Sequence, residues 1–274
     1  MDAPKLGYYD FGLTTVHACT LDQRFSWCAY VPRDYAADGT DRYRLLVAVH
    51  GTGRFMHLYR EQFTDYAERT RSIVLAPLFP AGITGPGDLS SYKLLRPCGI
   101  AYDRILLAMV DAAAAKYRLA SDRFALFGFS GGGHFTHRFL YLHPERLEAA
   151  SIGAPGVVTL LDPDHDFWVG VRNFESVWGR PIDLDAMRRV PVQMVVGGDD
   201  TETWEITIEP GNSLWMPGAD LAGRNRQDRM IALKASFENA GIAVRHDVVP
   251  GVAHRVERLI PAVQDFLADA VSRG

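Results

Sequence analysis

Cysteine is scarce in this chain of 274 residues, which has only Cys19, Cys28 and Cys98. An odd, small number without motif spacing argues against a disulfide framework and indicates reduced thiols. Cys19 and Cys28 could face each other across a hairpin, but the expected compartment disfavours a bridge. The histidines, cysteines and aspartates also lack the spacing of a zinc site, so we expect no metal and no other cofactor.

Long apolar runs and an excess of charge of one sign are missing as well. No run of about 18 apolar residues occurs, so we expect no membrane span. The first residues have neither the basic start nor the apolar core of a signal peptide, so we expect a cytoplasmic location. The net charge of −4 gives no support for nucleic-acid binding. The sequence leaves a homodimer open beside a monomer.

What is present is an ordinary globular composition, with 47% hydrophobic and 23% charged residues. The length is ample for a sizeable core. No repeat, low-complexity segment or linker divides the chain, so we expect residues 1–274 to form a single domain. Antiparallel strands are expected in residues 8–32, and five buried strands are predicted at 45–49, 73–76, 124–127, 147–152 and 192–196.

Segments with helical periodicity alternate with these strands. We predict helices at residues 56–70, 102–117, 134–142 and 228–239, then a last strand at 242–249 and a closing helix with Pro261 in its first turn. Such alternation predicts an α/β fold, with a mostly parallel sheet and helices on both faces.

Two long segments, residues 157–189 and 202–224, interrupt the alternation. Long excursions between core elements are often lids or binding loops, so we expect a small cap from these insertions. They are rich in aromatic residues, for which we weigh two roles that can hold together: lining an apolar substrate pocket and packing the cap against the sheet. These residues are Phe167, Trp168, Phe174, Trp178, Trp204 and Trp215.

Residues 128–132, Gly-Phe-Ser-Gly-Gly, fit the G-x-S-x-G pattern of a nucleophile elbow. An apolar run precedes the pattern and a plausible helix follows it, as the motif requires. A tight turn would expose the hydroxyl of Ser130, and the flanking glycines leave room where a Cβ would clash. The alternative is a glycine-rich turn with an ordinary serine.

A serine nucleophile needs a base, and His254 is the best candidate because it follows the last predicted strand. The orienting carboxylate is expected between serine and histidine in the chain. Asp199 and Asp200 follow a buried strand there; we favour Asp200, with Asp199 as the alternative. The other histidines are interpreted as structural or exposed, and His50 as a brace for its loop.

The oxyanion of a tetrahedral intermediate needs two N–H donors. We expect one from the backbone of Gly131, directly after the nucleophile. The second is expected from the glycine-rich loop at residues 50–53, and Thr52 is our choice.

With these motifs in this order, the chain resembles α/β-hydrolase fold enzymes from about residue 8 to its end. The anchors of the resemblance are residues 50–53, 128–132, 197–201 and 250–254. Within that group it is similar to the compact esterases that include polyhydroxybutyrate depolymerase-like and feruloyl esterase-like proteins. This finer placement rests on Ser91-Tyr-Lys to Tyr102-Asp-Arg-Ile-Leu and on the modest cap.

The resemblance implies a cofactor-free serine hydrolase that cleaves a small-molecule carboxylic ester through an acyl-enzyme. Two other functions remain open. The same triad serves amidases and peptidases. A ligand-binding protein that has kept the architecture but lost useful turnover is the third alternative.

Overall fold

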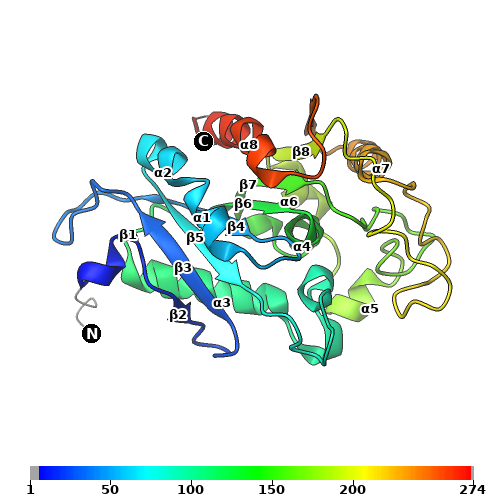
Figure 1. Cartoon of the computed structure of the whole chain (residues 1–274), viewed down its shortest axis with the longest axis horizontal. Coiled ribbons are helices and arrows are strands. Elements are labelled where there is room, and N and C mark those ends of the chain that lie inside the picture. Colours follow the sequence, from blue (N-terminus) through cyan, green and yellow to red (C-terminus); the bar gives the residue numbers. More distant parts are fainter. Residues whose placement is uncertain (1–5, 273–274) are drawn as a thin grey trace.

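The computed structural model describes residues 6–272, which form a twisted nine-stranded sheet with helices on both faces (Figure 1). The spatial order is β1-β3-β5-β4-β6-β7-β8-β9, with β2 also beside β3. Strands β4 to β9 pair in parallel, and β3 runs antiparallel to β5. The strands are β1 (Gly12–Leu13), β2 (His17–Ala18), β3 (Ser26–Val31), β4 (Arg44–Val49), β5 (Ser72–Leu78), β6 (Phe124–Phe129), β7 (Leu147–Gly153), β8 (Val192–Gly197) and β9 (Val244–Val249).

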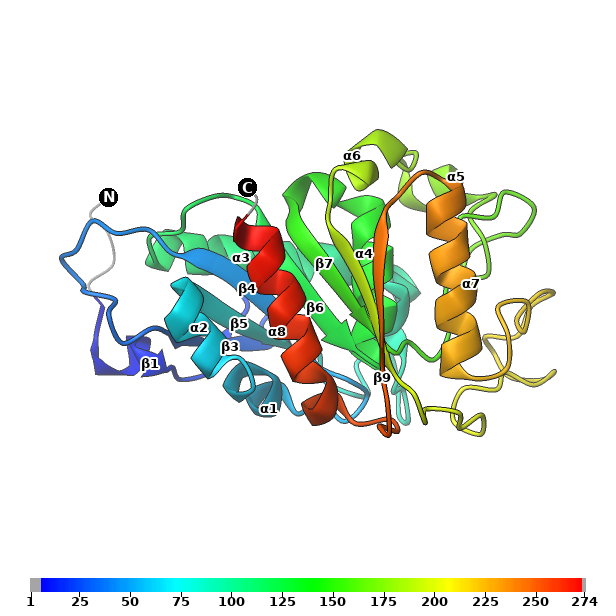
Figure 2. The same cartoon turned by 90° about the horizontal axis from the view of Figure 1, so that it is seen from above.

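The helices form a layer on each side of the sheet, with α1, α2 and α8 on one face and α3, α4 and α7 on the other (Figure 2). This arrangement confirms the predicted α/β class. The helices are α1 (Met56–Glu61), α2 (Thr64–Thr70), α3 (Tyr102–Lys116), α4 (Gly131–Leu142), α5 (Phe174–Trp178), α6 (Leu184–Arg188), α7 (Arg226–Asn239) and α8 (Val256–Ser272). Short 3-10 turns occupy η1 (Tyr8–Asp10), η2 (Ser91–Leu94), η3 (Pro97–Gly99) and η4 (Pro144–Arg146).

Several predicted boundaries differ from the structure. The predicted helix at 56–70 is two helices, because the chain leaves helical geometry at Phe63, whose buried ring packs 5.4 Å from that of Phe127. The N-terminal segment contributes two very short strands, β1 and β2, that both pair with β3. Pro261 lies beyond the first turn of α8, and β9 is a partly exposed edge strand.

The parallel strands determine where functional side chains gather. Strand β6 is buried along its whole length, and β4 along all but its first residue. Because neighbouring parallel strands end at the same edge, the loops after β4, β6 and β8 meet there. The loop after β9 joins them at that edge. The predicted functional motifs are therefore neighbours in space.

The two insertions lie beyond this edge and are largely irregular. Residues 157–189 contain the short helices α5 and α6, whereas residues 202–224 contain no helix or strand. The indole Nε1–H of Trp168 donates to the carbonyl of Leu214 at 2.8 Å and so links the two insertions. Their role as a cap stays a prediction.

All three cysteines lie within the described residues and are free thiols. No helix in residues 6–272 has both the length and the apolar character that crossing a bilayer requires.

Candidate active site

Ser130 stands at a sharp turn between β6 and α4, as the motif predicts. Its φ of 56° and ψ of −115° are unusual for a residue with a side chain, and its N–H donates to the Gly153 carbonyl at 2.8 Å. At the flanking glycines the neighbouring backbone leaves no room for a side chain. A Cβ on Gly128 would overlap the Gly132 carbonyl, and one on Gly132 would overlap the Val49 carbonyl.

His254 and Asp200 are joined by a short polar contact. The imidazole Nδ1 lies 2.6 Å from Oδ2 of Asp200, which is only 1% exposed. Since an ionised carboxylate only accepts, Nδ1 carries the proton and Nε2 is left as the acceptor. The imidazole also stacks on the ring of Phe129, with centroids 4.5 Å apart. Asp199 is exposed, and its N–H bonds to the Val252 carbonyl at 2.8 Å.

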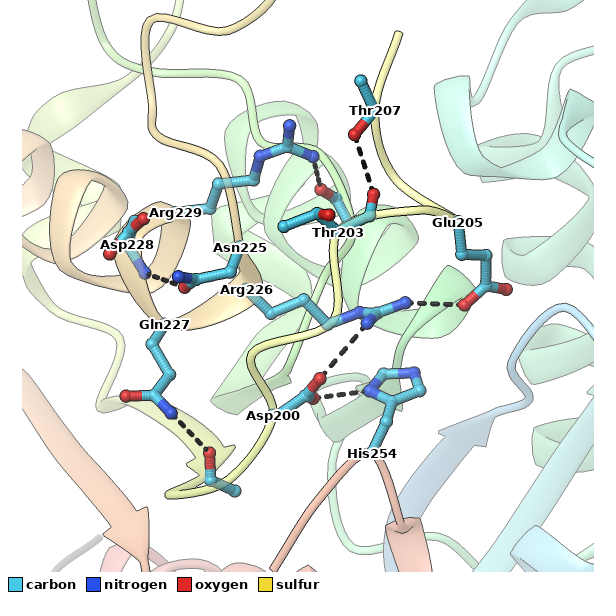
Figure 3. A network of polar contacts seen from close by, with 12 residues as sticks. Asp200, Thr203, Glu205, Thr207, Asn225, Arg226, Gln227, Asp228, Arg229 and His254 are labelled. Atoms are coloured by element: carbon cyan, nitrogen blue, oxygen red, sulfur yellow. Dashed lines mark hydrogen bonds and ion pairs between the residues drawn. The ribbon is translucent and has the colours of Figure 1, made fainter.

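Arg226, the first residue of α7, holds the other side of this carboxylate (Figure 3). Its Nη1 donates to Oδ1 of Asp200 at 3.2 Å, and its Nη2 donates to Oε2 of Glu205 at 2.7 Å. The Arg226 side chain is 2% exposed. Sequence reasoning missed this residue because it belongs to no motif, and only the fold brings the start of α7 to Asp200.

The glycine-rich loop after β4 is held by His50. Its Nδ1 donates to the Gly51 carbonyl at 2.8 Å, and its Nε2 accepts the Phe79 N–H at 3.0 Å. Burial lowers the pKa of His50 to about 4, so the ring is neutral. The Tyr92 hydroxyl donates to the His50 carbonyl at 3.1 Å. These contacts agree with the predicted brace and fix the loop that carries Thr52.

Two hollows share Ser130 as part of their lining. The His254 hollow, of about 250 Å³, is bordered by Phe55, Leu58, Ser130 and His254. The Lys93 pocket, of about 240 Å³, lies between η2, Ser130 and the insertion at 202–224. Thr52, Ser130 and Glu205 line both. Within residues 6–272 the structure places no hydrogen bond between the Ser130 hydroxyl and the imidazole, although both line one hollow.

Among the described residues, no phenylalanine or tryptophan of the two insertions lines either hollow at Ser130. The apolar walls of the Lys93 pocket are aliphatic. Phe174 and Trp178 are buried in the main core instead. Trp204 is 77% exposed and Trp215 is 45% exposed, so neither is buried in the cap. The alternative, packing, therefore holds for the buried members of the set.

The histidines of α4 are structural, as predicted. Nε2 of His134 accepts the N–H groups of Gly156 and Val157 at 2.7 and 3.2 Å. Nδ1 of His137 donates to the Gly133 carbonyl at 2.8 Å, and its Nε2 accepts the Thr159 N–H at 3.1 Å. Burial holds the pKa of both rings well below the usual value, so both are neutral. Within the part of the chain that the structure covers, no cluster of three or more His, Cys, Asp or Glu side chains could hold a metal ion.

No protein-family model matches the chain. No curated protein matches it either. Solved structures do resemble it. Poly(aspartic acid) hydrolase-1 from Sphingomonas sp. KT-1 is 23% identical with a TM-score of 0.70, over 88% of this chain and 92% of that one. The poly(3-hydroxybutyrate) depolymerase from Bordetella parapertussis is 22% identical with a TM-score of 0.71, over 91% and 87%.

More distant neighbours include an S-formylglutathione hydrolase from Staphylococcus aureus, 17% identical with a TM-score of 0.59, over 90% of this chain and 92% of that one. A ferulic acid esterase is also similar, at 15% identity and a TM-score of 0.59, over the same shares of the two chains. The resemblance predicted from the motifs is confirmed at the level of structure. This chain has the α/β-hydrolase fold.

Proposed function

We propose that this protein is a serine hydrolase that cleaves a carboxylic ester with Ser130, His254 and Asp200. The observation that supports it most directly is the 2.6 Å contact between Asp200 and His254, whose ring borders the same hollow as the nucleophile-elbow serine. Solved structures of hydrolases and esterases with this fold add support.

In the proposed reaction the Ser130 hydroxyl attacks the ester carbonyl while Nε2 of His254 takes its proton. Asp200 keeps the proton of the neutral ring on Nδ1 and stabilises the imidazolium that forms. The backbone N–H groups of Gly131 and Thr52 donate to the oxyanion. The imidazolium then protonates the departing alkoxide, and an acyl-enzyme remains.

Water completes the cycle. Nε2 of His254 removes a proton from a water molecule, which attacks the acyl carbonyl. The bond between the acyl carbon and the Ser130 oxygen then breaks, the imidazolium returns its proton to that oxygen, and the acid is released. The hydrogen bond between Ser130 and His254 that this requires is formed when substrate is bound, since such contacts are often loose in free enzymes.

The test is hydrolysis of p-nitrophenyl acetate and p-nitrophenyl butyrate by the wild type and by Ser130→Ala. We expect the variant to lose at least about 10³-fold in kcat while its unfolding midpoint stays unchanged. Ser176→Ala, at an exposed serine outside the two hollows, is the matched control and should behave as wild type. Equal turnover by Ser130→Ala and wild type would refute the assignment.

A further inference from the structure

Lys93 is a cation that the proposed reaction does not use, and it lies beside the nucleophile elbow. Its Cε is 3.1 Å from the position that a Cβ would occupy on Gly131. Lys93 and Ser130 line the same pocket. Within residues 6–272 no carboxylate forms an ion pair with it, and its hydrogen bond there is to Ser90 Oγ at 3.3 Å.

The other charges of the pocket are already compensated. Arg226 is paired with Glu205 at 2.7 Å and with Asp200 at 3.2 Å. His134, which also lines the pocket, is neutral because it is buried and accepts two N–H groups. Among the described residues that line the pocket, Lys93 is therefore the positive charge without a carboxylate partner. An ammonium taken partly out of water is favourable only with a partner, and a bound anion supplies one.

The lining of the two hollows also indicates where the alcohol and acyl portions of an ester would bind. The imidazolium of His254 must protonate the departing alkoxide, so the alcohol portion belongs in the His254 hollow. The acyl portion then enters the Lys93 pocket, which Ser130 also lines but His254 does not. Its aliphatic walls, which include Val157, Ile206 and Leu214, suit a short methylene chain.

From this geometry we infer that the substrate is an ester whose acyl chain ends in a carboxylate, and that the ammonium of Lys93 binds that carboxylate. The product would be a short dicarboxylic acid. This inference rests on the proposed function, because it assumes that Ser130 receives the acyl group. Lys93 is thus a specificity-determining residue of the acyl pocket.

The test compares three ethyl esters of similar length: monoethyl glutarate, which is anionic, ethyl pentanoate, which is neutral, and ethyl trimethylammoniobutanoate, which is cationic. We expect kcat/KM to fall in that order for the wild type. Lys93→Met should lower kcat/KM for monoethyl glutarate on the order of tenfold to a hundredfold, as expected for a lost charge-assisted hydrogen bond. It should change ethyl pentanoate by less than about threefold.

Two further variants serve as controls. Lys93→Arg keeps the charge and should retain part of the preference for the anionic ester. Lys234→Met removes a lysine that is paired with Glu238 on α7 and should leave all three rates unchanged. An equal loss on the neutral and anionic esters in Lys93→Met would overturn the inference, because it would mean that Lys93 acts on the oxyanion or on folding. A wild-type kcat/KM that is higher for ethyl pentanoate than for monoethyl glutarate would also overturn the inference.

Binding to Ser130→Ala separates this inference from the proposed function, since it needs no turnover. Monoethyl glutarate should raise the unfolding midpoint of Ser130→Ala, and the shift should disappear in Ser130→Ala/Lys93→Met. A stabilised Ser130→Ala with no esterase activity in the wild type would refute the proposed reaction and keep the anion site. No stabilisation by monoethyl glutarate, with ethyl pentanoate hydrolysed normally, would refute the anion site alone.

Discussion

Arg226 and His254 contact opposite oxygens of the Asp200 carboxylate, at 3.2 Å on Oδ1 and 2.6 Å on Oδ2. The same guanidinium holds Glu205 of the insertion at residues 202–224. The insertion that borders the two hollows is thus linked by one side chain to the proposed triad acid.

Arg226→Met should therefore lower both the stability and the kcat of the protein. It would leave Oδ1 of the buried Asp200 without its cation, and breaking a buried ion pair typically costs about 3–5 kcal/mol of stability. We also expect kcat to fall on the order of tenfold or more, because Asp200 can then turn away from His254. Glu205→Gln is the matched control: its side chain is 43% exposed and Asp200 keeps Arg226, so the loss should stay below about 1 kcal/mol. Urea unfolding and kcat for p-nitrophenyl butyrate measure both effects, and equal behaviour of the two variants would contradict this account.

Two adjacent aspartates give a direct test of the triad acid. Asp200→Asn should lower kcat by about 10⁴-fold, since an amide no longer selects the required imidazole tautomer. Asp199→Asn changes an exposed side chain next to it and should stay within about twofold of wild type. Steady-state kinetics on one ester suffices. The reverse ranking would assign the role to Asp199.

Acid should destabilise the protein through its buried neutral histidines. The pKa of His50 is lowered by burial to about 4, whereas an unfolded chain protonates histidine near 6.5. Between these values the unfolded state binds a proton that the folded state does not. The stability from this group is therefore complete above about pH 6.5 and is lost as the pH falls toward 4, by on the order of 3 kcal/mol.

Urea unfolding at several pH values measures this loss, and nitrogen-15 NMR of the histidine side chains identifies the groups. His50 should stay neutral, with its proton on Nδ1, down to about pH 5. His57→Gln, at an exposed histidine, should leave the dependence unchanged. A free energy of unfolding that is constant from about pH 6.5 to 4 would contradict the buried neutral state.

The preference for an anionic ester should weaken in alkali. Burial, with Arg54 and Arg138 nearby, lowers the pKa of Lys93 to about 8, while Glu205 and Asp88 oppose the shift. Above that pH the ammonium becomes neutral and loses its attraction for a carboxylate. The ratio of kcat/KM for monoethyl glutarate to that for ethyl pentanoate should fall between about pH 7 and 9 in the wild type. It should stay constant in Lys93→Arg, because a guanidinium keeps its charge; a constant wild-type ratio would count against the role of Lys93.

The sequence predicted the fold class and the meeting of Ser130, Asp200 and His254 at one edge of the sheet, because these depend on local turn chemistry and on strand ends. It could not predict Arg226 or Lys93, because their positions depend on how α7 packs beside β8 and β9 and on how η2 packs against α4. The sequence also could not predict how the aromatic residues of the insertions are used. Their number can be read from the composition, whereas the packing of the insertions decides which of them are buried.

The proposed reaction depends most on Ser130 being an activated nucleophile. Incubation with a fluorophosphonate, followed by mass spectrometry of the digested protein, tests this without knowledge of the substrate. We predict one phosphonyl adduct, on the peptide that contains Ser130, which is absent in Ser130→Ala and forms much more slowly in His254→Ala. A folded wild-type protein that gains no adduct, or gains it at another residue, would contradict the account.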